Sequence, residues 1–212
     1  MTDEDGIPAL SRRGFLSGSA AASMAVVLGA CGGGGGASAT ATATATRRLA
    51  ATPSCDDGDE HPTDAQTEGP FFEPGSPRRR NLVAAGLRGV PLAVTGLVVD
   101  TRCRPIAGAL LDFWQADAAG RYDNAGYRLR GHQFADGRGR FDLRTIVPGL
   151  YPGRTRHVHV KVQRPHGPVL TTQLYFPGEP RNRTDSIFDA ALVMDVRRAA
   201  RGRRATFSFV LA

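Results

Sequence analysis

Two histidines separated by a single residue, His157 and His159, are the most informative pair in this sequence. They alternate with valines at positions 158, 160 and 162, which indicates a β-strand whose successive side chains point to opposite faces. If the valines face a hydrophobic core, both imidazoles point together to the other face, where they could bind a metal ion as a pair. The same pattern also fits an amphipathic strand with two polar residues in solvent, so the histidines alone do not establish a metal site.

Tyr151 is the residue that could complete such a site. It is one of only four tyrosines and precedes His157 by six residues, in the loop expected to enter the strand. A phenol must lose a proton with a pKa of about 10 to bind a metal, so a tyrosine ligand favours a hard, high-valent ion such as ferric iron. No cysteine lies nearby to suggest a zinc–thiolate site, and Gln163 stands where a cupin site would carry a glutamate. The other histidines lie in loop-like sequence or before a turn: His61, His132 and His166.

The elements that must position these residues are short runs of alternating apolar residues between turn sequences. Such runs predict seven strands, over residues 92–99, 109–115, 141–147, 157–163, 169–176, 191–196 and 206–211. No stretch of 12 or more residues shows helical periodicity. We therefore predict an all-β fold, an antiparallel β-sandwich with long loops over residues 63–212, preceded by a disordered signal and tether segment.

The first 62 residues indicate an exported protein. Residues 11–16 (SRRGFL) match a twin-arginine export pattern, and the apolar run that follows over residues 20–30 is too short to span a membrane. Residues 28–31 (LGAC) resemble a bacterial lipobox, in which Cys31 would be lipidated and would attach the protein to a membrane. An apolar helix beside an ordinary cysteine is the simpler alternative. We expect a signal peptide over residues 1–30, a low-complexity tether over residues 31–62, and a periplasmic or extracellular location.

The composition narrows the class of protein further. Hydrophobic residues make up 41% and charged residues 22%, which suits a globular domain and excludes a coiled coil, a polytopic membrane protein and a disulfide-dense miniprotein. The formal charge of +7 is scattered and not interleaved with aromatic residues, which argues against nucleic acid as a partner. Exported proteins commonly bridge their remaining cysteines, so Cys55 and Cys103 are expected to form a disulfide.

Over residues 67–176 the chain resembles the intradiol ring-cleavage dioxygenases, the family of catechol 1,2- and protocatechuate 3,4-dioxygenases. The resemblance is carried by separated motifs in the order of the family, which makes it far more specific than the histidine pair. The motifs are TEGPFF at 67–72, DFWQAD at 112–117 with GRY at 120–122, FDLRTI at 141–146 with PGLYP at 148–152, RTRHVH at 154–159, and TQLYF at 172–176.

This resemblance implies a non-haem iron(III) cofactor held by two tyrosinates and two histidines. Matched motif by motif, the metal ligands are Tyr122, Tyr151, His157 and His159. Tyr151 and His159 would be the axial pair, and a hydroxide would bind beside the other two ligands. Tyr127 is a nearby competitor for the first tyrosine, but the Gly-Arg-Tyr context favours Tyr122.

The activity that the resemblance implies is intradiol cleavage of a catecholic ring with O2, giving a cis,cis-muconate-type dicarboxylic acid. The implied catalytic residues are Arg154, which stabilises charge on the substrate ring, Tyr151, which accepts a catechol proton, and Gln173, which lines the pocket. Only five residues separate Tyr151 from His157, which predicts an open pocket like that of the secreted, short-loop members. Unsubstituted catechol is the expected substrate, ahead of protocatechuate and hydroxyquinol, and no cofactor other than iron is implied.

Two rival interpretations remain. A non-catalytic β-sandwich surface lipoprotein could bind a phenolic or glycan ligand on the same fold, without turnover at iron. A different metalloenzyme could use only the histidine pair, for example with copper, which leaves Tyr122 and Tyr151 unexplained. Of the neighbouring residues, we expect Trp114 to lie in the core and Arg156 to be an exposed charge at the rim.

Overall fold

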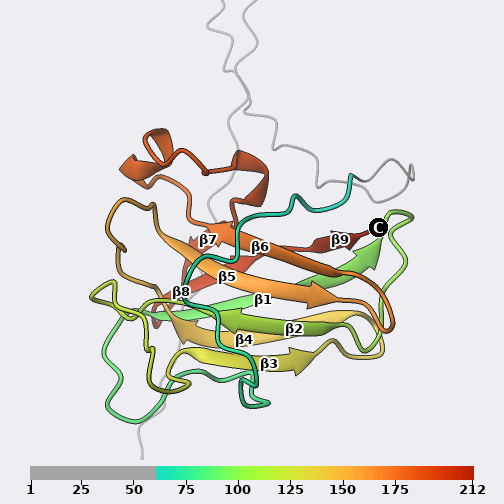
Figure 1. The fold of residues 1–212 in the computed structure, drawn as a ribbon, viewed down its shortest axis with the longest axis horizontal. Helices are drawn as coiled ribbons and strands as arrows, with labels where there is room; N and C mark the ends of the chain where they lie inside the picture. The colour runs from blue at the N-terminus through green and yellow to red at the C-terminus, as the bar shows by residue number, and fades with distance from the viewer. Residues whose placement is uncertain (1–60) are drawn as a thin grey trace, which may run out of the picture. The chain divides into compact units, whose positions relative to one another are not determined.

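Nine β-strands make up most of the regular structure of residues 61–212, the part of the chain that the computed structural model describes (Figure 1). Two short 3₁₀ helices, η1 (Pro180–Arg183) and η2 (Ala190–Leu192), lie between the sixth and seventh strands. No helix in this described part is long and apolar enough to cross a membrane. The strands are β1 (Pro91–Asp100), β2 (Leu110–Trp114), β3 (Arg130–Phe134), β4 (Arg140–Ile146), β5 (His157–Gln163), β6 (Val169–Tyr175), β7 (Asp195–Arg198), β8 (Arg203–Thr206) and β9 (Phe209–Leu211).

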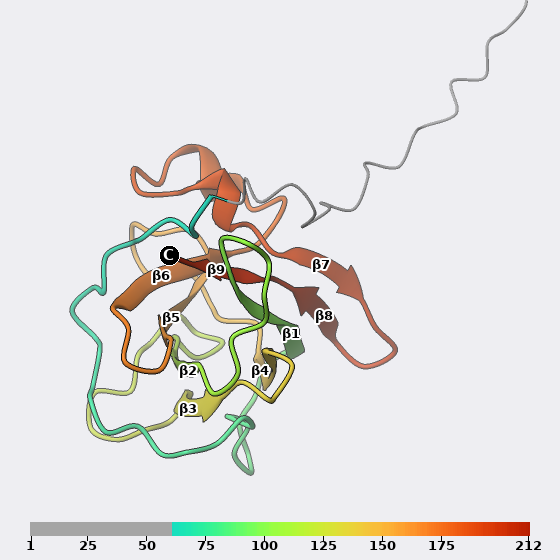
Figure 2. The same ribbon diagram turned by 90° about the vertical axis from the view of Figure 1, so that its right-hand side faces the viewer.

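The strands form two sheets that pack face to face, as Figure 2 shows. One sheet has the order β3-β2-β5-β6, and all of its pairings are antiparallel. The other has the order β4-β1-β8-β7, and β9 continues beside β1. β8 and β9 both run parallel to β1, while the other pairings of this sheet are antiparallel. The predicted all-β sandwich is confirmed, with these two parallel pairings as an addition.

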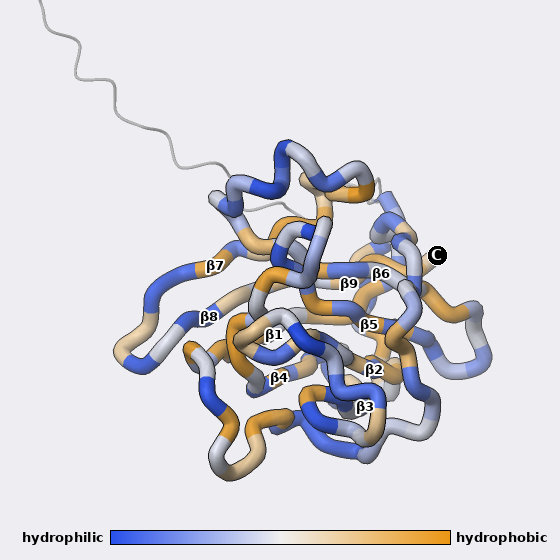
Figure 3. Tube along the Cα trace, turned by 60° about the vertical axis from the view of Figure 1, so that its left-hand side comes forward, coloured by the Kyte–Doolittle hydropathy of each residue, from blue (hydrophilic) through white to orange (hydrophobic). Residues whose placement is uncertain are grey.

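The core lies between the two sheets, where the predicted strand faces meet. Val158, Val160 and Val162 of β5 are all buried in it, as their alternation with the histidines predicts. Phe113 of β2 and Phe141 of β4 join the two sheets, with ring centroids 6.0 Å apart. Figure 3 shows hydrophobic stretches along the strands and hydrophilic ones in the connecting segments and the β7–β8 hairpin. Burying each large apolar side chain contributes about 1.5–3 kcal/mol, so this interface is the main source of stability.

Three parts of the strand prediction were wrong. β3 was missed because its sequence, RGHQF, has no apolar alternation, and it forms through backbone pairing with β2. The predicted strand over 191–196 is η2 followed by β7, and the one over 206–211 is split between β8 and β9. The split occurs where the carbonyl oxygen of Phe207 approaches Gly96 of β1, and a Cβ on Gly96 would lie only 1.6 Å from that oxygen. The close backbone approach therefore requires glycine.

Residues 61–77 form an extended segment, here called the strap, that crosses the outer face of β6 and β5 (Figure 1). Backbone hydrogen bonds join Thr63 N to Val210 O at 2.9 Å and Gln66 N to Thr171 O at 2.8 Å. From the end of the strap the chain bridges the two sheets, because Pro77 O accepts from His132 N on β3 and Arg80 O accepts from Arg144 N on β4. The strap thus covers the face of β5 that carries the two histidines.

Candidate metal centre

His157 and His159 project side by side from β5 on the face beneath the strap. Their Nε2 atoms are 3.1 Å apart. The two residues are only 4% and 3% exposed. The alternative of two polar residues in solvent is therefore wrong, because both rings are enclosed and directed at one another.

The protonation state of His157 and His159 leaves nitrogen lone pairs free to bind a metal. His157 Nδ1 lies 2.7 Å from the carbonyl oxygen of Thr155, so Nδ1 carries the proton and Nε2 presents its lone pair toward His159. Burial lowers the pKa of His157 to about 4. Burial also lowers the pKa of His159 well below its ordinary value, and the neighbouring His157 and Arg154 lower it further. Both imidazoles are thus neutral near neutral pH, the form that binds metals.

A phenol oxygen joins the two imidazoles. The hydroxyl of Tyr122 is 3.1 Å from His157 Nε2. The Tyr151 ring stands edge-on to that of Tyr122, with centroids 5.8 Å apart. Phe71 of the strap stacks on Tyr122, with centroids 4.4 Å apart and planes within 17°. Three possible donor atoms, Tyr122 Oη and the Nε2 atoms of both histidines, therefore converge on one point. The ring of Tyr151 lies beside them.

Glycines allow the two tyrosine-bearing loops to come together. Gly120, two residues before Tyr122, has a positive φ of 79°, and a Cβ there would lie 2.2 Å from the carbonyl oxygen of Leu150. Gly149 N donates to Asp117 O at 2.7 Å across the same junction. Because Leu150 directly precedes Tyr151, this backbone contact places the two tyrosines side by side.

The donor set fits a hard trivalent cation. Within residues 61–212 no group of three or more His, Cys, Asp or Glu side chains could hold a metal, so a centre here with three or more side-chain ligands would have to include tyrosine oxygen. Burial raises the pKa of Tyr122 well above its ordinary value, so this phenol stays protonated unless a nearby cation replaces its proton. His159 Nδ1 is buried without a hydrogen-bond partner among the described residues. Two neutral imidazoles and phenol oxygens match ferric iron better than a softer ion.

Arg154 and Gln173, the other two residues predicted for the site, lie beside the ligand set and contact each other. Arg154 Nη2 donates to Gln173 Oε1 at 2.7 Å. Gln173 is fully buried on β6, directly opposite His159 in the strand register, and its Nε2 donates to Thr67 O of the strap at 2.9 Å. The structure therefore gathers all six predicted site residues in one place.

Three residues around the site carried no signal in the sequence that assigned them a place there. Asp185, from the segment after η1, accepts from Arg154 Nε at 2.9 Å. The hydroxyl of Tyr175 donates to Ile187 O at 2.9 Å and lies 3.2 Å from Gln173 Oε1. Arg130 at the start of β3 is buried beneath the Tyr122 loop. No sequence motif pointed to these contacts, and the Asp185–Arg154 pair joins residues 31 positions apart, which only the fold brings together.

Trp114 and Arg156 also border the site. Trp114 is buried, as predicted, but its ring also stacks on that of His159, with centroids 4.8 Å apart and planes within 9°. The expectation that Arg156 is an exposed rim charge was wrong. Its side chain is mostly buried and donates to Glu179 at 2.8 Å and to Pro148 O, so it ties the loop before β5 to the loop after β6.

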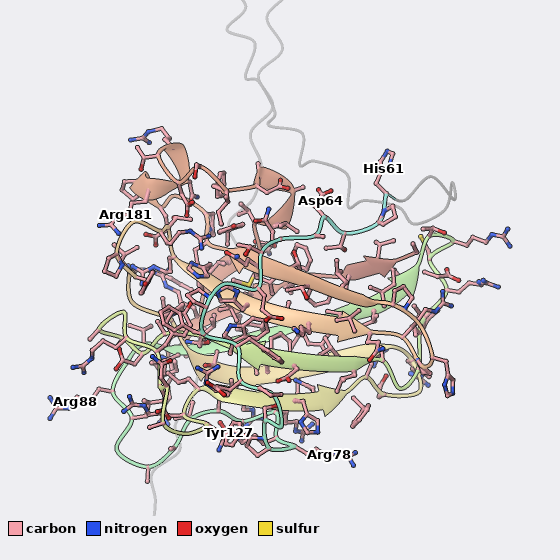
Figure 4. All side chains as sticks on the ribbon, in the orientation of Figure 1. His61, Asp64, Arg78, Arg88, Tyr127 and Arg181 are labelled. Carbon is pink, nitrogen blue, oxygen red and sulfur yellow. The ribbon has the colours of Figure 1, made fainter. Side chains whose placement is uncertain are left out.

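The remaining candidates lie elsewhere. Tyr127 is 41% exposed, donates to Pro74 O at 2.9 Å and lies at the lower edge of the sandwich near Arg78 (Figure 4). His132 lies within β3, not before a turn, and contacts Ser76. His61 is exposed, and His166 is an exposed residue of the β5–β6 turn. A cavity of about 820 Å³ bordered by β1, β3 and β4 contains none of the predicted site residues.

The twin-arginine motif, Cys31 and Cys55 lie outside the described residues. Cys103, in the turn after β1, is one half of a disulfide. Its pairing with Cys55 remains a prediction.

Comparison with known proteins places this chain among dioxygenases. A family profile described as "Dioxygenase" matches residues 67–212. The 6-chlorohydroxyquinol 1,2-dioxygenase of Cupriavidus pinatubonensis is 32% identical over 180 residues, covering 70% of this chain and 64% of that protein. The protocatechuate 3,4-dioxygenase β chain of Burkholderia cepacia is 35% identical over 118 residues, covering 47% of this chain and 50% of that one. The chain thus spans between about half and two thirds of the length of these curated relatives.

Solved structures of dioxygenases are also similar to this chain. The dioxygenase domain of a dioxygenase–carbohydrate-binding protein fusion from Streptomyces sp. SirexAA-E is 62% identical, with a TM-score of 0.70, covering 71% of this chain and 98% of that one. The 3-chlorocatechol 1,2-dioxygenase of Rhodococcus opacus 1CP is 29% identical, with a TM-score of 0.65, covering 70% of this chain and 72% of that one.

Proposed function

Because the chain belongs to the intradiol ring-cleavage dioxygenase family, we propose that it uses O2 to cleave a catecholic ring between its two hydroxylated carbons. The product would be a cis,cis-muconate-type dicarboxylic acid. The observation that carries the proposal is the convergence of Tyr122 Oη, His157 Nε2 and His159 Nε2, with successive separations of 3.1 Å. Tyr122, Tyr151, His157 and His159 would hold a ferric ion, which when bound supplies a Lewis acid for the substrate oxygens.

Arg154 is the cation of the substrate pocket. Its guanidinium is anchored by Asp185 through Nε and by Gln173 through Nη2, so it needs little reorganisation to face a charged substrate. The side chain is 19% exposed, whereas that of Asp185 is 2% exposed, so the arginine side of the pair is the one that reaches the pocket. We assign Arg154 to stabilising negative charge that develops on the catechol ring.

Tyr151 is the proton acceptor in this proposal. A catechol that binds through both oxygens must release two protons, and Tyr151 Oη can take one of them while a hydroxide takes the other. The ring of Tyr151 packs against Phe71, with centroids 5.3 Å apart, and is only partly buried. Tyr151 is therefore more accessible to a bound catechol than the enclosed His157.

Catechol itself is the proposed first substrate, with protocatechuate and hydroxyquinol next. The short connection between Tyr151 and His157 supports an open entrance, since Pro152 and Gly153 at its turn are exposed. The curated relatives are named for chlorohydroxyquinol, protocatechuate, catechol, hydroxyquinol and chlorocatechol, so the family accepts several substituted rings.

We further propose that the protein is exported through the twin-arginine pathway and attached to the membrane by a lipid on Cys31. This pathway moves folded proteins, so iron could be loaded before export. Replacing Arg12 and Arg13 with lysines should retain the protein in the cytoplasm. Replacing Cys31 with alanine should release it from the membrane fraction, and retention there would contradict the lipid anchor.

The first experiment is a visible absorption spectrum of the purified protein before and after catechol is added without oxygen. Ferric iron bound to tyrosinate absorbs visible light, so we expect a coloured protein whose band shifts when catechol binds. Oxygen uptake with one ring opened per O2 consumed would then establish turnover. A protein that stays colourless after reconstitution with ferric iron would contradict the iron–tyrosinate site and favour the non-catalytic binding lipoprotein.

A further inference from the structure

Arg130 is a buried cation without a direct ion pair: burial lowers its pKa, and the more distant carboxylates of Glu73, Asp123 and Asp112 oppose this only by longer-range attraction. It begins β3 and is 2% exposed, and no carboxylate oxygen lies within 4.0 Å of its guanidinium in the described part of the chain. Burying an unpaired charge is costly unless hydrogen bonds or nearby anions compensate it. Its place in the fold therefore calls for a reason beyond packing.

The guanidinium bonds to two segments that meet at Tyr122. Nε and Nη2 both donate to the carbonyl oxygen of Asp123, at 3.1 Å and 2.7 Å, and Nη1 donates to the carbonyl oxygen of Phe71. Asp123 directly follows Tyr122, and the Phe71 ring is the one that stacks on Tyr122. Arg130 thus holds both the backbone that carries this tyrosine and the ring that covers it.

We propose that Arg130 is a positioning residue for the metal centre, which clamps the strap to the Tyr122 loop and so fixes the Tyr122 oxygen beside His157. The inference rests on the proposed function, because it assigns the clamp to an iron-binding tyrosinate. The planar fork of an arginine can bond two carbonyl groups at once, which a lysine ammonium cannot do with the same geometry. The positive charge of the Arg130 guanidinium beside the Tyr122 loop also favours the anionic form of the Tyr122 oxygen over the neutral phenol.

A second arginine, Arg79 of the segment after the strap, also bonds to the loop that carries Tyr122, and it allows positioning to be separated from general loop packing. Arg79 bonds to the C-terminal end of the Tyr122 loop, where β3 begins. Its Nε donates to Arg130 O at 3.0 Å and its Nη2 donates to Tyr127 O. It makes no hydrogen bond to Asp123 or Phe71. Arg79→Met therefore removes a similar guanidinium–carbonyl clamp, including the bond to the Arg130 backbone, but leaves the bonds of the Arg130 guanidinium to Asp123 O and Phe71 O in place. It is the matched control for Arg130→Met.

The test compares wild type, Tyr122→Phe, Arg130→Met, Arg130→Lys and Arg79→Met after reconstitution with ferric citrate. The readouts are the position and intensity of the visible band, the iron retained against a competing chelator, and the thermal midpoint of the iron-free protein. For Arg130→Met we expect a band like that of Tyr122→Phe and an iron affinity lower by roughly 10- to 100-fold. Arg130→Lys should fall between this variant and wild type, and it is the variant to measure if Arg130→Met does not fold.

Arg79→Met should lower the thermal midpoint yet keep the wild-type band and affinity. The positioning role is wrong if the Arg130 variants also keep the wild-type visible band and iron affinity. It is equally wrong if Arg79→Met loses that band and affinity to the same extent as Arg130→Met. If the wild-type protein itself binds no iron, the proposed function fails, and this inference falls with it. A coloured wild type beside an unchanged Arg130→Met overturns the inference alone.

Discussion

The carboxylate of Asp185 holds Arg154 at one edge of the metal centre, with Oδ2 2.9 Å from Arg154 Nε. The same oxygen accepts from the backbone N–H of Thr155 at 2.8 Å, so a single acidic group fixes both the side chain and the backbone at this point. The hydrogen bonds from Thr155 and Ile187 and the contact with Arg154 hold the pKa of Asp185 below its usual value, although burial opposes them. Asp185 is therefore ionised at neutral pH and provides a rigid base for Arg154.

Replacing Asp185 with asparagine should weaken both stability and turnover. The substitution leaves a largely buried guanidinium without its counter-charge, which typically costs about 3–5 kcal/mol of unfolding free energy. We expect kcat/KM for catechol to fall by at least about tenfold, a loss of about 1.4 kcal/mol of transition-state stabilisation. Steady-state oxygen uptake and urea unfolding are the measurements. Asp189→Asn, which alters only the cap of η2, is the control and should leave kcat/KM unchanged.

Replacing Tyr151 with phenylalanine should distinguish the dioxygenase from a copper site built on the histidine pair. The variant keeps the ring and its packing but loses the phenol oxygen. We expect a weakened, shifted visible band and almost complete loss of oxygen uptake. Unchanged metal content together with unchanged activity would support the histidine-only site. Tyr127→Phe is the control, since its hydroxyl bonds Pro74 O outside the site, and it should behave as wild type.

The stability of the iron-free protein should depend on pH through His157. Its pKa is about 4 in the folded state because of burial, against about 6.5 when unfolded, so the unfolded state binds more protons between these values. Stability from this group is therefore fully present above about pH 6.5 and is lost as pH falls toward 4, by about 3 kcal/mol in total. Urea unfolding at a series of pH values measures the slope. His159 is also buried with a lowered pKa and adds to the slope, so His157→Gln should reduce the slope without abolishing it. An equally steep slope in that variant would contradict the assignment.

Replacing Gly96 with alanine should disrupt the junction of β8 and β9. The added Cβ would lie 1.6 Å from the carbonyl oxygen of Phe207, a backbone atom that cannot move aside cheaply. We expect a loss of more than about 3 kcal/mol of unfolding free energy, or failure to fold. Gly137→Ala is the control, because a Cβ there would meet nothing within 4 Å. Equal thermal midpoints for the two variants would show that the backbone approach is not required.

The sequence by itself determined the strand that carries the histidines. Alternation along β5 dictates that Val158 and His159 face opposite sides, because the side-chain period of a strand is a local property of the backbone. The motifs likewise favoured Tyr122 over Tyr127. Hydrophobic alternation failed at β3, where Arg130 and Gln133 stand in place of apolar residues and backbone pairing alone forms the strand.

Only the tertiary structure decided how the site is assembled. The approach of Gly120 to Leu150, the ion pair between Asp185 and Arg154, and the clamp of Arg130 on Phe71 join residues about 30 or more positions apart. Such contacts depend on loop paths and sheet packing, which side-chain periodicity does not encode, because periodicity describes each element separately and these contacts lie between elements. The sequence thus specified which groups could bind a metal, and the fold brought their donor atoms together.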